Sequence, residues 1–213
     1  MNNIDHIFYI NLKSRIDRFN EINNEFNKIG LIKNDNEGNI SSIPERFDAF
    51  STPGFGILGC TISHCTVLTI AKSRNYKNVL IFEDDFTFLI NQEEFEAEIS
   101  NIFDNHVDFD VIFFSYNLIK SEQSTEYPFL QRVFNSSTAS CYLVAGHYFD
   151  SLINLYNDNI PLLDNTKEHW KYANDVVWEK LMIKDKWYAT NTRVGKQRPS
   201  FSDNSNEFMD YPC

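Results

Sequence analysis

The chain has 213 residues, a hydrophobic content of 42% and a formal net charge of −11 at pH 7. These totals suit one sizeable core, and the acidic balance argues against nucleic-acid or anionic-membrane partners, since both need a basic face. No apolar run approaches the ~20 residues of a membrane span, and residues 1–5 lack a signal peptide's basic start. We therefore expect a protein of the cytoplasm, or of the host cytoplasm for a viral source, with reduced cysteines and no transmembrane segment.

The first half of the chain alternates between strand-like and helix-like patterns. An apolar run predicts a strand at Ile7–Leu12, and apolar residues spaced by three and four from Ile16 to Ile29 predict a helix. Ser14 with Asp17 resembles a capping box, and Gly30 suits the end of that helix. The further elements expected are loop Lys33–Ser42, strand Glu45–Phe50, helix Cys60–Arg74, strand Val79–Phe82, helix Glu93–Phe103 and strand Phe109–Ser115.

The second half is less regular. Its expected elements are loop Ser121–Tyr127, strands Phe129–Phe134 and Ser140–Ala145, helix Tyr148–Tyr156, loop Pro161–Lys167, helix Glu168–Lys184, strand Trp187–Thr190 and the tail 191–213. The alternation of strands and helices predicts a single α/β domain, with a mostly parallel central sheet flanked by helices.

Three adjacent carboxylates, Glu83, Asp84 and Asp85, end the predicted buried strand that begins at Val79. Open α/β sheets bind ligands at the carboxyl ends of such strands. In extended chain Glu83 and Asp85 share one face about 7 Å apart, while Asp84 points the other way or into the turn. That pair suits a hard cation, Mg²⁺ or Mn²⁺, held together with substrate phosphates. The alternative is an acidic turn that faces solvent.

Two basic islands interrupt this acidic chain. Lys13, Arg15 and Arg18 follow the first strand, where nucleotide-binding folds place phosphate contacts. This first island, and likewise a second one in the C-terminal tail, is interpreted either as a ligand-binding group or as a solvated basic face. Long irregular segments often form lids, so the tail is predicted to close over a bound ligand. The second island lies in that tail and comprises Arg193, Lys196 and Arg198.

Asp175 lies among apolar residues in the last predicted helix. A carboxylate in such surroundings has a raised pKa and can act as a general base, and an exposed acid between buried neighbours is the alternative. His64 also has two interpretations, because a histidine in a helix more often has a structural role than a role in binding. Cys60 and Cys65 lack a matched partner for metal or nucleophilic chemistry, so both are interpreted as small core residues.

Four segments, in order along the chain, resemble glycosyltransferase family 25, which includes bacterial lipo-oligosaccharide galactosyltransferases and collagen hydroxylysine galactosyltransferases. Any one of the four is weak, and together they are specific. They are Ile10-Asn11-Leu12 with Arg15, Asp17 and Arg18, similar to INLxxRxDR; Gly56–His64, similar to GxxGCxxSH; Leu80–Asp85, a strand ending in Glu-Asp-Asp; and Gln197-Arg198-Pro199 with Ser202-Asp203.

The resemblance implies a Rossmann-like GT-A fold, a UDP-galactose or UDP-glucose donor, Mn²⁺ (or Mg²⁺) and inversion at the anomeric carbon. In such a site Glu83 and Asp85 are expected as metal ligands, and Asp203 is expected, from its position in the tail, to complete the metal shell. Asp175 is expected to act as the base that deprotonates the acceptor hydroxyl. The acceptor is expected to be a glycan or a hydroxylysine-type protein. Donor contacts are expected from Asn11, Arg15, Arg18, Ser63, His64, Asp84 and Arg198.

The predicted single domain, residues 1–213, divides into a nucleotide-sugar half (1–120), an acceptor-side half (121–190) and a C-terminal tail or lid (191–213). Larger family members carry extra sequence at both ends, and this chain has almost none. Little then remains to form an acceptor site. The expectation is a small acceptor, or a site shared between the subunits of a homodimer.

Two other classes of protein compete with the transferase interpretation. A Mg²⁺ phosphohydrolase would need a strand-end Asp-x-Asp and a downstream lysine, whereas the first acid here is Glu83 and no such lysine is evident. A non-catalytic sugar-nucleotide-binding module would have no need to retain three mutually repelling carboxylates. The sequence therefore favours the transferase.

Overall fold

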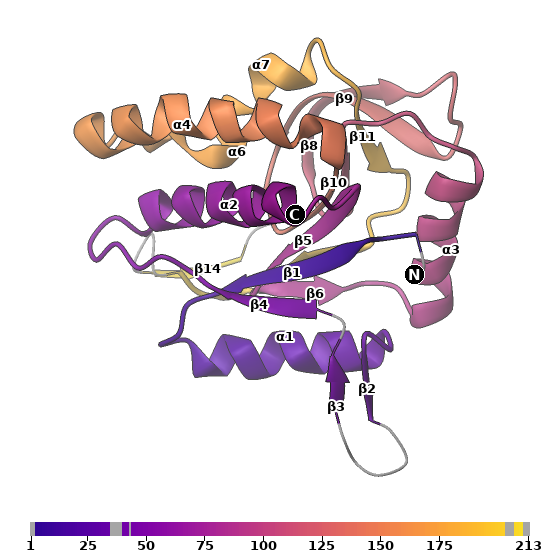
Figure 1. The fold of residues 1–213 in the computed structure, drawn as a ribbon, viewed down its shortest axis with the longest axis horizontal. Coiled ribbons are helices and arrows are strands. Elements are labelled where there is room, and N and C mark those ends of the chain that lie inside the picture. The colour runs from indigo at the N-terminus through magenta and orange to yellow at the C-terminus, as the bar shows by residue number, and fades with distance from the viewer. Residues whose placement is uncertain (1–2, 35–39, 43, 203–206, 211–213) are drawn as a thin grey trace.

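In the computed structural model, which describes residues 3–34, 40–42, 44–202 and 207–210, the main sheet has eight strands (Figure 1). Strands β4, β1 and β5 pair in parallel, as do β7 and β11, while β10 and β9 run antiparallel to both neighbours. The sheet is therefore mixed, with most strands in one direction, which confirms the predicted α/β class. The order is β4 (Pro44–Asp48), β1 (His6–Asn11), β5 (Asn78–Glu83), β10 (Cys141–Ala145), β7 (Val111–Phe113), β11 (Trp187–Thr190), β9 (Leu130–Ser137) and β8 (Asn117–Gln123).

Strand β5, between β1 and β10, carries the run that ends in the three acids. Its four apolar residues are fully buried and alternate between two apolar clusters, as the two-residue period of a strand requires. Val79 and Ile81 join the cluster on one face, and Leu80 and Phe82 join the cluster on the other. The predicted strand, buried on both faces, is confirmed, and it places Glu83 at the carboxyl edge of the sheet.

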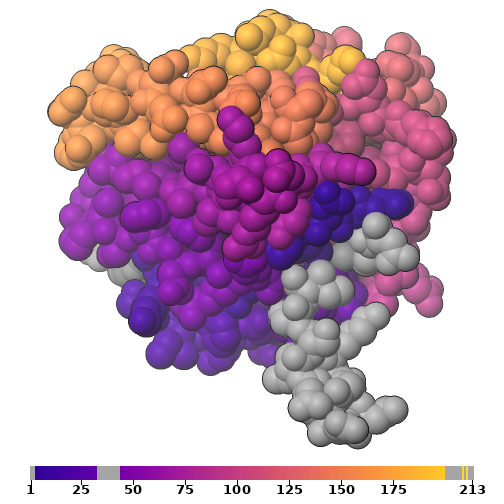
Figure 2. All heavy atoms as spheres, in the orientation of Figure 1, coloured from indigo at the N-terminus to yellow at the C-terminus, as the bar shows by residue number. Residues whose placement is uncertain are grey.

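Different helices cover the two faces of the sheet. Helices α2 (Gly56–Ser73) and α4 (Phe149–Thr166) lie side by side over one face, and Figure 2 shows the side chains of α4 along α2. Helices α1 (Ile16–Lys28) and α3 (Gln92–Asp104) supply apolar side chains to the cluster on the other face. Within the described residues, no helix has both the length and the apolarity to cross a bilayer.

The region after residue 160 differs most from the sequence prediction. Helix α4 runs through Pro161 to Thr166, so the predicted loop Pro161–Lys167 is wrong. The predicted helix Glu168–Lys184 is instead three short helices, and the break between the first two lies at Ala173, whose backbone is extended (ψ 153°). A continuous helix would direct Trp170 into the core with Trp178, whereas Trp170 is 62% exposed. The short helices are α5 (His169–Tyr172), α6 (Asn174–Val177) and α7 (Glu179–Met182).

Three smaller corrections concern loops and a helix end. The predicted loop Lys33–Ser42 contains paired strands, and the predicted loop Ser121–Tyr127 overlaps β8. The capping box is wrong, because α1 begins after Arg15 without a side-chain cap, and the Asp17 carboxylate accepts from the Arg15 guanidinium instead. The remaining elements are β2 (Ile32–Asn34), β3 (Ile40–Ser42), β6 (Phe86–Phe88), η1 (Gly146–Tyr148), β12 (Gly195–Gln197), β13 (Ser200–Ser202) and β14 (Glu207–Met209).

The tail returns to the acidic strand end. Strand β12 pairs antiparallel with β6, which follows the three acids directly, and opposes Gln197 to Phe86. The backbone N–H of Arg198 donates to the Asp85 carbonyl at 2.6 Å. Tertiary pairing therefore brings the second basic island next to a strand that lies about a hundred residues earlier in the chain.

Candidate active site

A cavity of about 700 Å³ opens at the carboxyl ends of β1 and β5. It is lined by segments that lie far apart in the sequence: the turn before α1, the loop after β4, the acids after β5, the α5–α6 region and the start of the tail. Of the residues expected at the site, those lining it are Arg15, Arg18, Glu83, Asp84, Asp85, Asp175 and Arg198. Asp203 lies outside the described residues.

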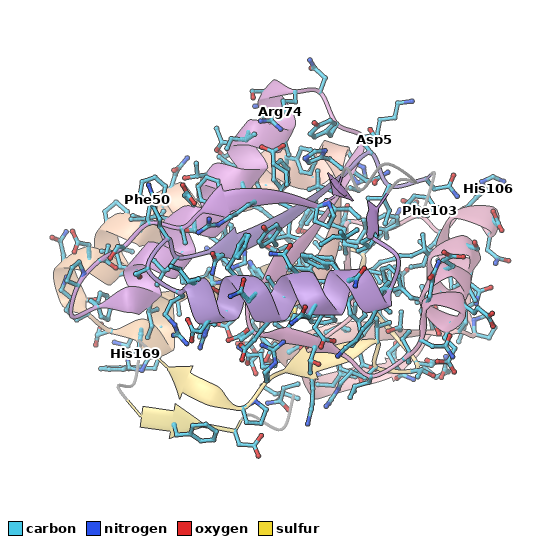
Figure 3. All side chains as sticks on the ribbon, turned by 90° about the horizontal axis from the view of Figure 1, so that it is seen from below. Asp5, Phe50, Arg74, Phe103, His106 and His169 are labelled. Carbon is cyan, nitrogen blue, oxygen red and sulfur yellow. The ribbon has the colours of Figure 1, made fainter. Side chains whose placement is uncertain are left out.

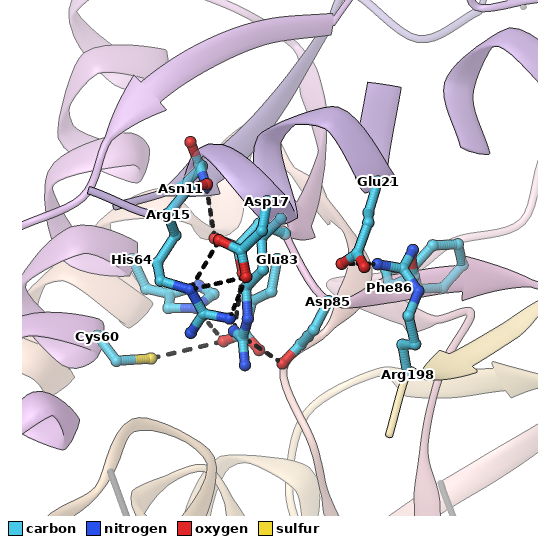
Figure 4. Close-up of polar contacts among 12 residues, drawn as sticks. Asn11, Arg15, Asp17, Glu21, Cys60, His64, Glu83, Asp85, Phe86 and Arg198 are labelled. Atoms are coloured by element: carbon cyan, nitrogen blue, oxygen red, sulfur yellow. Dashed lines mark hydrogen bonds and ion pairs between the residues drawn. The ribbon is translucent and has the colours of Figure 1, made fainter. Parts of the chain in front are cut away.

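Arg18 lies between two of the three acids and explains how they coexist. Its guanidinium donates to Asp84 Oδ1 at 3.0 Å and to Asp85 Oδ2 at 3.3 Å. Figure 4 shows Glu83 and Asp85 of this cluster close to Asn11 and Arg15. The side-chain amide of Asn11, at the end of β1, donates to Asp84 Oδ2 at 2.7 Å. Both carboxylate oxygens of Asp84 therefore have a partner, one from β1 and one from α1. Asn11 holds Asp84, and Asp84 in turn helps to fix the position of Arg18.

The three carboxyl groups have different proton affinities. Burial, and then the charge of Glu83, raise the pKa of Asp85 to about 7, against the opposing effect of Arg18. Burial also raises the pKa of Asp84. Burial acts in the same direction on Glu83, but the contact with His64 lowers the pKa of Glu83 below its usual value. Glu83 is therefore the acid that most favours the carboxylate form, and the pKa of Asp85 lies near neutral pH.

His64 holds Glu83 from behind the cavity. Its Nε2 lies 2.9 Å from Glu83 Oε1 and its Nδ1 lies 2.7 Å from the Tyr142 hydroxyl, and the imidazole is fully buried. Ser63 is also fully buried: it donates to the Gly59 carbonyl and accepts from the Phe50 backbone N–H at 2.9 Å. Neither Ser63 nor His64 is among the residues that line the cavity, so both lie behind its wall.

Gly59 explains part of the GxxGC pattern. A Cβ on Gly59 would lie 2.2 Å from the Phe50 carbonyl oxygen and 2.9 Å from Thr52 Oγ1. A side chain at residue 59 would therefore push the loop after β4 away from α2. The Gly59 N–H donates to Thr52 Oγ1 at 2.9 Å, which fixes that loop as a wall of the cavity.

The donor atoms at the acid cluster fit a hard divalent cation. Asp85 Oδ1 and Asn11 Oδ1 are buried and accept no hydrogen bond from any described residue, although buried oxygens normally have a partner. The Asn11 amide nitrogen is already used by Asp84, which leaves its oxygen as the free acceptor. Carboxylate and amide oxygens are ligands that Mg²⁺ and Mn²⁺ prefer. We conclude that Asp85, with Glu83 nearby, has the chemistry needed to bind a metal ion.

A second set of candidate metal ligands also meets at Glu83. Cys60 Sγ, His64 Nε2 and Glu83 Oε1 all lie within 4.8 Å of one another. The Cys60 thiol donates to Glu83 Oε1 at 3.5 Å. Burial raises the pKa of the Cys60 thiol, which disfavours the thiolate form that a metal ion would require. These three groups contact one another as they stand, whereas Asp85 Oδ1 and Asn11 Oδ1 accept no hydrogen bond within the described part of the chain.

Asp175 reaches the cavity because of the break before α6. Burial raises its pKa, while the Thr138 backbone N–H, which donates to Asp175 Oδ2 at 3.1 Å, acts in the opposite direction. Thr138 has φ 87°, a conformation that β-branched residues rarely adopt. Such strain is characteristic of functional sites. A carboxylate with a raised pKa, facing the acid cluster across the same cavity, is suited to accept a proton.

The two basic islands are separated by the fold. Arg15 lines the cavity and pairs with Asp17, and Arg198 lines it and pairs with Glu21 on α1. Arg193 instead lies over the Tyr116 ring at 5.3 Å. Lining residues to which the sequence alone assigned no role include Thr138, His169, Trp170 and Gln197, although Gln197 belongs to the tail motif.

The raised pKa of Asp85 gives a testable effect on stability. In the folded protein without a metal ion, Asp85 holds its proton up to about pH 7, whereas in the unfolded chain it releases it near its ordinary value of 3.8. The free energy of unfolding should therefore fall as pH rises through this window, at about 1.4 kcal/mol per unit of pKa difference. We expect urea unfolding with chelator to show a larger loss from pH ~5 to pH ~8 for wild type than for Asp85→Asn. Equal losses would contradict the assignment.

The fold is an α/β domain with a mixed, mostly parallel sheet, and the acid cluster lies at the carboxyl ends of its central strands. The family model "Glycosyltransferase family 25 (LPS biosynthesis protein)" matches residues 4–173. The chain therefore belongs to glycosyltransferase family 25, as predicted. The "Glycosyltransferase 25 family member" of Drosophila pseudoobscura pseudoobscura is 29% identical in an alignment of 136 residues that covers 56% of this chain. The match spans 22% of the length of that relative.

Solved structures resemble the chain at low sequence identity. The glycosyltransferase GlyE of Streptococcus pneumoniae TIGR4 is 10% identical with a TM-score of 0.45, covering 88% of this chain and 45% of that one. The 4-diphosphocytidyl-2C-methyl-D-erythritolsynthase of Anaerococcus prevotii DSM 20548 is 11% identical with a TM-score of 0.44, covering 95% and 75%. A197 from STIV is 12% identical with a TM-score of 0.41, covering 86% and 80%.

Proposed function

We propose that this chain is an inverting, metal-dependent glycosyltransferase that moves galactose or glucose from UDP-galactose or UDP-glucose to an acceptor hydroxyl. The acceptor is a glycan or a hydroxylysine-type protein. One observation carries the proposal: a carboxylate suited to act as a base, Asp175, lines the same cavity as the acid cluster and the arginines. This arrangement offers separate groups for the donor phosphates and for the acceptor proton.

The donor binds between the acid cluster and the arginine side chains. Arg15 and Arg198 line the cavity and pair with partly exposed acids, and both guanidinium groups contact the diphosphate of the donor. Arg18 stays between Asp84 and Asp85 and sets the net charge of the cluster. When bound through Glu83 and Asp85, with Asp203 as the proposed third ligand, Mn²⁺ supplies positive charge that stabilises the leaving UDP.

The acceptor reacts on the Asp175 side of the cavity. Asp175 takes the proton of the acceptor hydroxyl as that oxygen bonds to the anomeric carbon and the bond from this carbon to the UDP oxygen breaks. Attack on the face opposite the leaving group inverts the anomeric configuration. The Thr138 N–H bonds to Oδ2 of Asp175 and so orients the carboxylate.

The direct test is release of UDP from UDP-galactose and from UDP-glucose, with Mn²⁺ and with chelator, alongside calorimetric titration of UDP binding. We expect release from one donor that chelator abolishes, and loss of release in Asp85→Ala, which removes the carboxylate with the unpartnered oxygen. The matched control is Asp164→Ala, an exposed acid on α4 whose change should have no effect. Absence of both release and UDP binding in wild type would refute the proposal.

A further inference from the structure

The cavity has two walls with different chemistry. The wall from α1, the acid cluster and the tail carries Arg15, Arg18 and Arg198. The second wall comes from α5 and α6, and Figure 1 shows α6 on the opposite side of the sheet from α1. Residues at β8 and around Thr138 complete this wall. No lysine or arginine from residues 117, 137–139 or 169–176, all of them described, lines the cavity. This second wall is formed by neutral polar, aromatic and apolar groups around Asp175.

Trp170 is the prominent group on the second wall. It is 62% exposed, whereas the two other tryptophans, Trp178 and Trp187, are fully buried in the core. Its neighbour His169 packs edge-on against the indole, with ring centroids 5.1 Å apart. Exposed apolar side chains continue along the rim at Val176 and at Phe50. Figure 3 shows Phe50 and His169 at the same end of the molecule.

We propose that Trp170 is an acceptor-binding residue and that this wall selects a neutral hexose at the acceptor position. This inference rests on the proposed function. The face of an indole can pack against the apolar C–H face of a pyranose, and a large aromatic surface supplies much binding free energy. Asn117 and Thr138 line the same wall and offer side-chain hydrogen bonds to hydroxyl groups. An acidic sugar would find no lysine or arginine here and would be repelled by Asp175.

Fluorescence quenching gives a test that does not depend on turnover. Because Trp178 and Trp187 are fully buried, acrylamide should quench mainly Trp170, and Trp170→Phe should remove that accessible component. Lactose or methyl β-galactopyranoside, added with saturating UDP and Mn²⁺, should lower the quenching constant of wild type at least about twofold. Sialyllactose, as the acidic comparator, and UDP with Mn²⁺ alone should leave it unchanged.

Kinetics separate this inference from the proposed function. Trp170→Ala should raise the acceptor KM about tenfold or more, which corresponds to about 1.4 kcal/mol, with the donor KM unchanged, and Trp170→Phe should retain most of the affinity. The matched control Ile183→Ala changes a side chain of similar exposure outside the cavity and should have no effect.

Three outcomes would overturn the assignment of Trp170. Protection by UDP and Mn²⁺ alone would place the indole at the donor. Protection by a hydroxylysine peptide but by no sugar would indicate a protein acceptor. No protection by any probe, with UDP binding intact, would show that Trp170 is not an acceptor site while leaving the proposed transferase standing. Failure of UDP binding itself would instead refute the proposed function.

Discussion

Asp175→Asn should reduce the rate of sugar transfer by about 10²–10⁴-fold while leaving donor binding intact, because general-base catalysis contributes an effect of that size. The amide keeps the volume of the carboxylate and can still accept the Thr138 N–H, so the local structure should persist. It cannot accept a proton from the acceptor. The loss should therefore appear in kcat, measured as UDP release with acceptor present, and UDP titration should give an unchanged dissociation constant.

The pH profile adds an independent readout for this variant. Burial raises the pKa of Asp175, so wild-type kcat/KM should increase with pH beyond the ordinary carboxyl range and level off once Asp175 is ionised. The residual activity of Asp175→Asn should lack this acidic limb. Asp110→Asn is the matched control, since Asp110 is a buried carboxylate before β7 that does not line the cavity. A variant at Asp175 with near-normal kcat would exclude it as the base.

Arg18→Met should lower the free energy of unfolding by roughly 3–5 kcal/mol, the range for removing one partner of a buried ion pair. Arg18 and its two partners are each 13% exposed or less at their side chains, so little water is available to replace the guanidinium. Methionine retains much of the side-chain volume, which isolates the charge. For a domain of this size the melting temperature should fall by about 10 °C.

The same variant should respond more strongly to Mn²⁺ than wild type. With Arg18 gone, Asp84 and Asp85 lack the cation that offsets their repulsion, so a divalent ion should restore part of the lost stability. Thermal unfolding with Mn²⁺ and with chelator measures this difference. Arg74→Met is the control, because Arg74 pairs with Glu45 at the exposed surface, where ion pairs contribute little. A wild-type melting temperature for Arg18→Met would show that Arg18 does not hold the cluster together.

The buried strand and the position of the acids at its end could be predicted from the sequence, because both depend on local patterns of residues. Four successive apolar residues bury a strand on both faces, and Glu83 follows at its end whatever the surroundings. The break at Ala173 had no such signal, since neither proline nor glycine occurs there. The break at Ala173 allows Trp178 to be buried while Trp170 is exposed. This difference in burial depends on packing against helices α2 and α4.

The sequence alone determined the α/β class, the family motifs and the acidic strand end, because each is carried by neighbouring residues and by their spacing. Tertiary structure decided how the charges are distributed: Arg18 joins Asp84 to Asp85, His64 holds Glu83 from behind, and β12 brings Arg198 back to β6. Burial and pairing between distant segments set the protonation of each carboxylate, and a linear sequence specifies neither directly. The proposed base, the proposed metal ligands and the proposed acceptor wall therefore become distinguishable only in the folded protein.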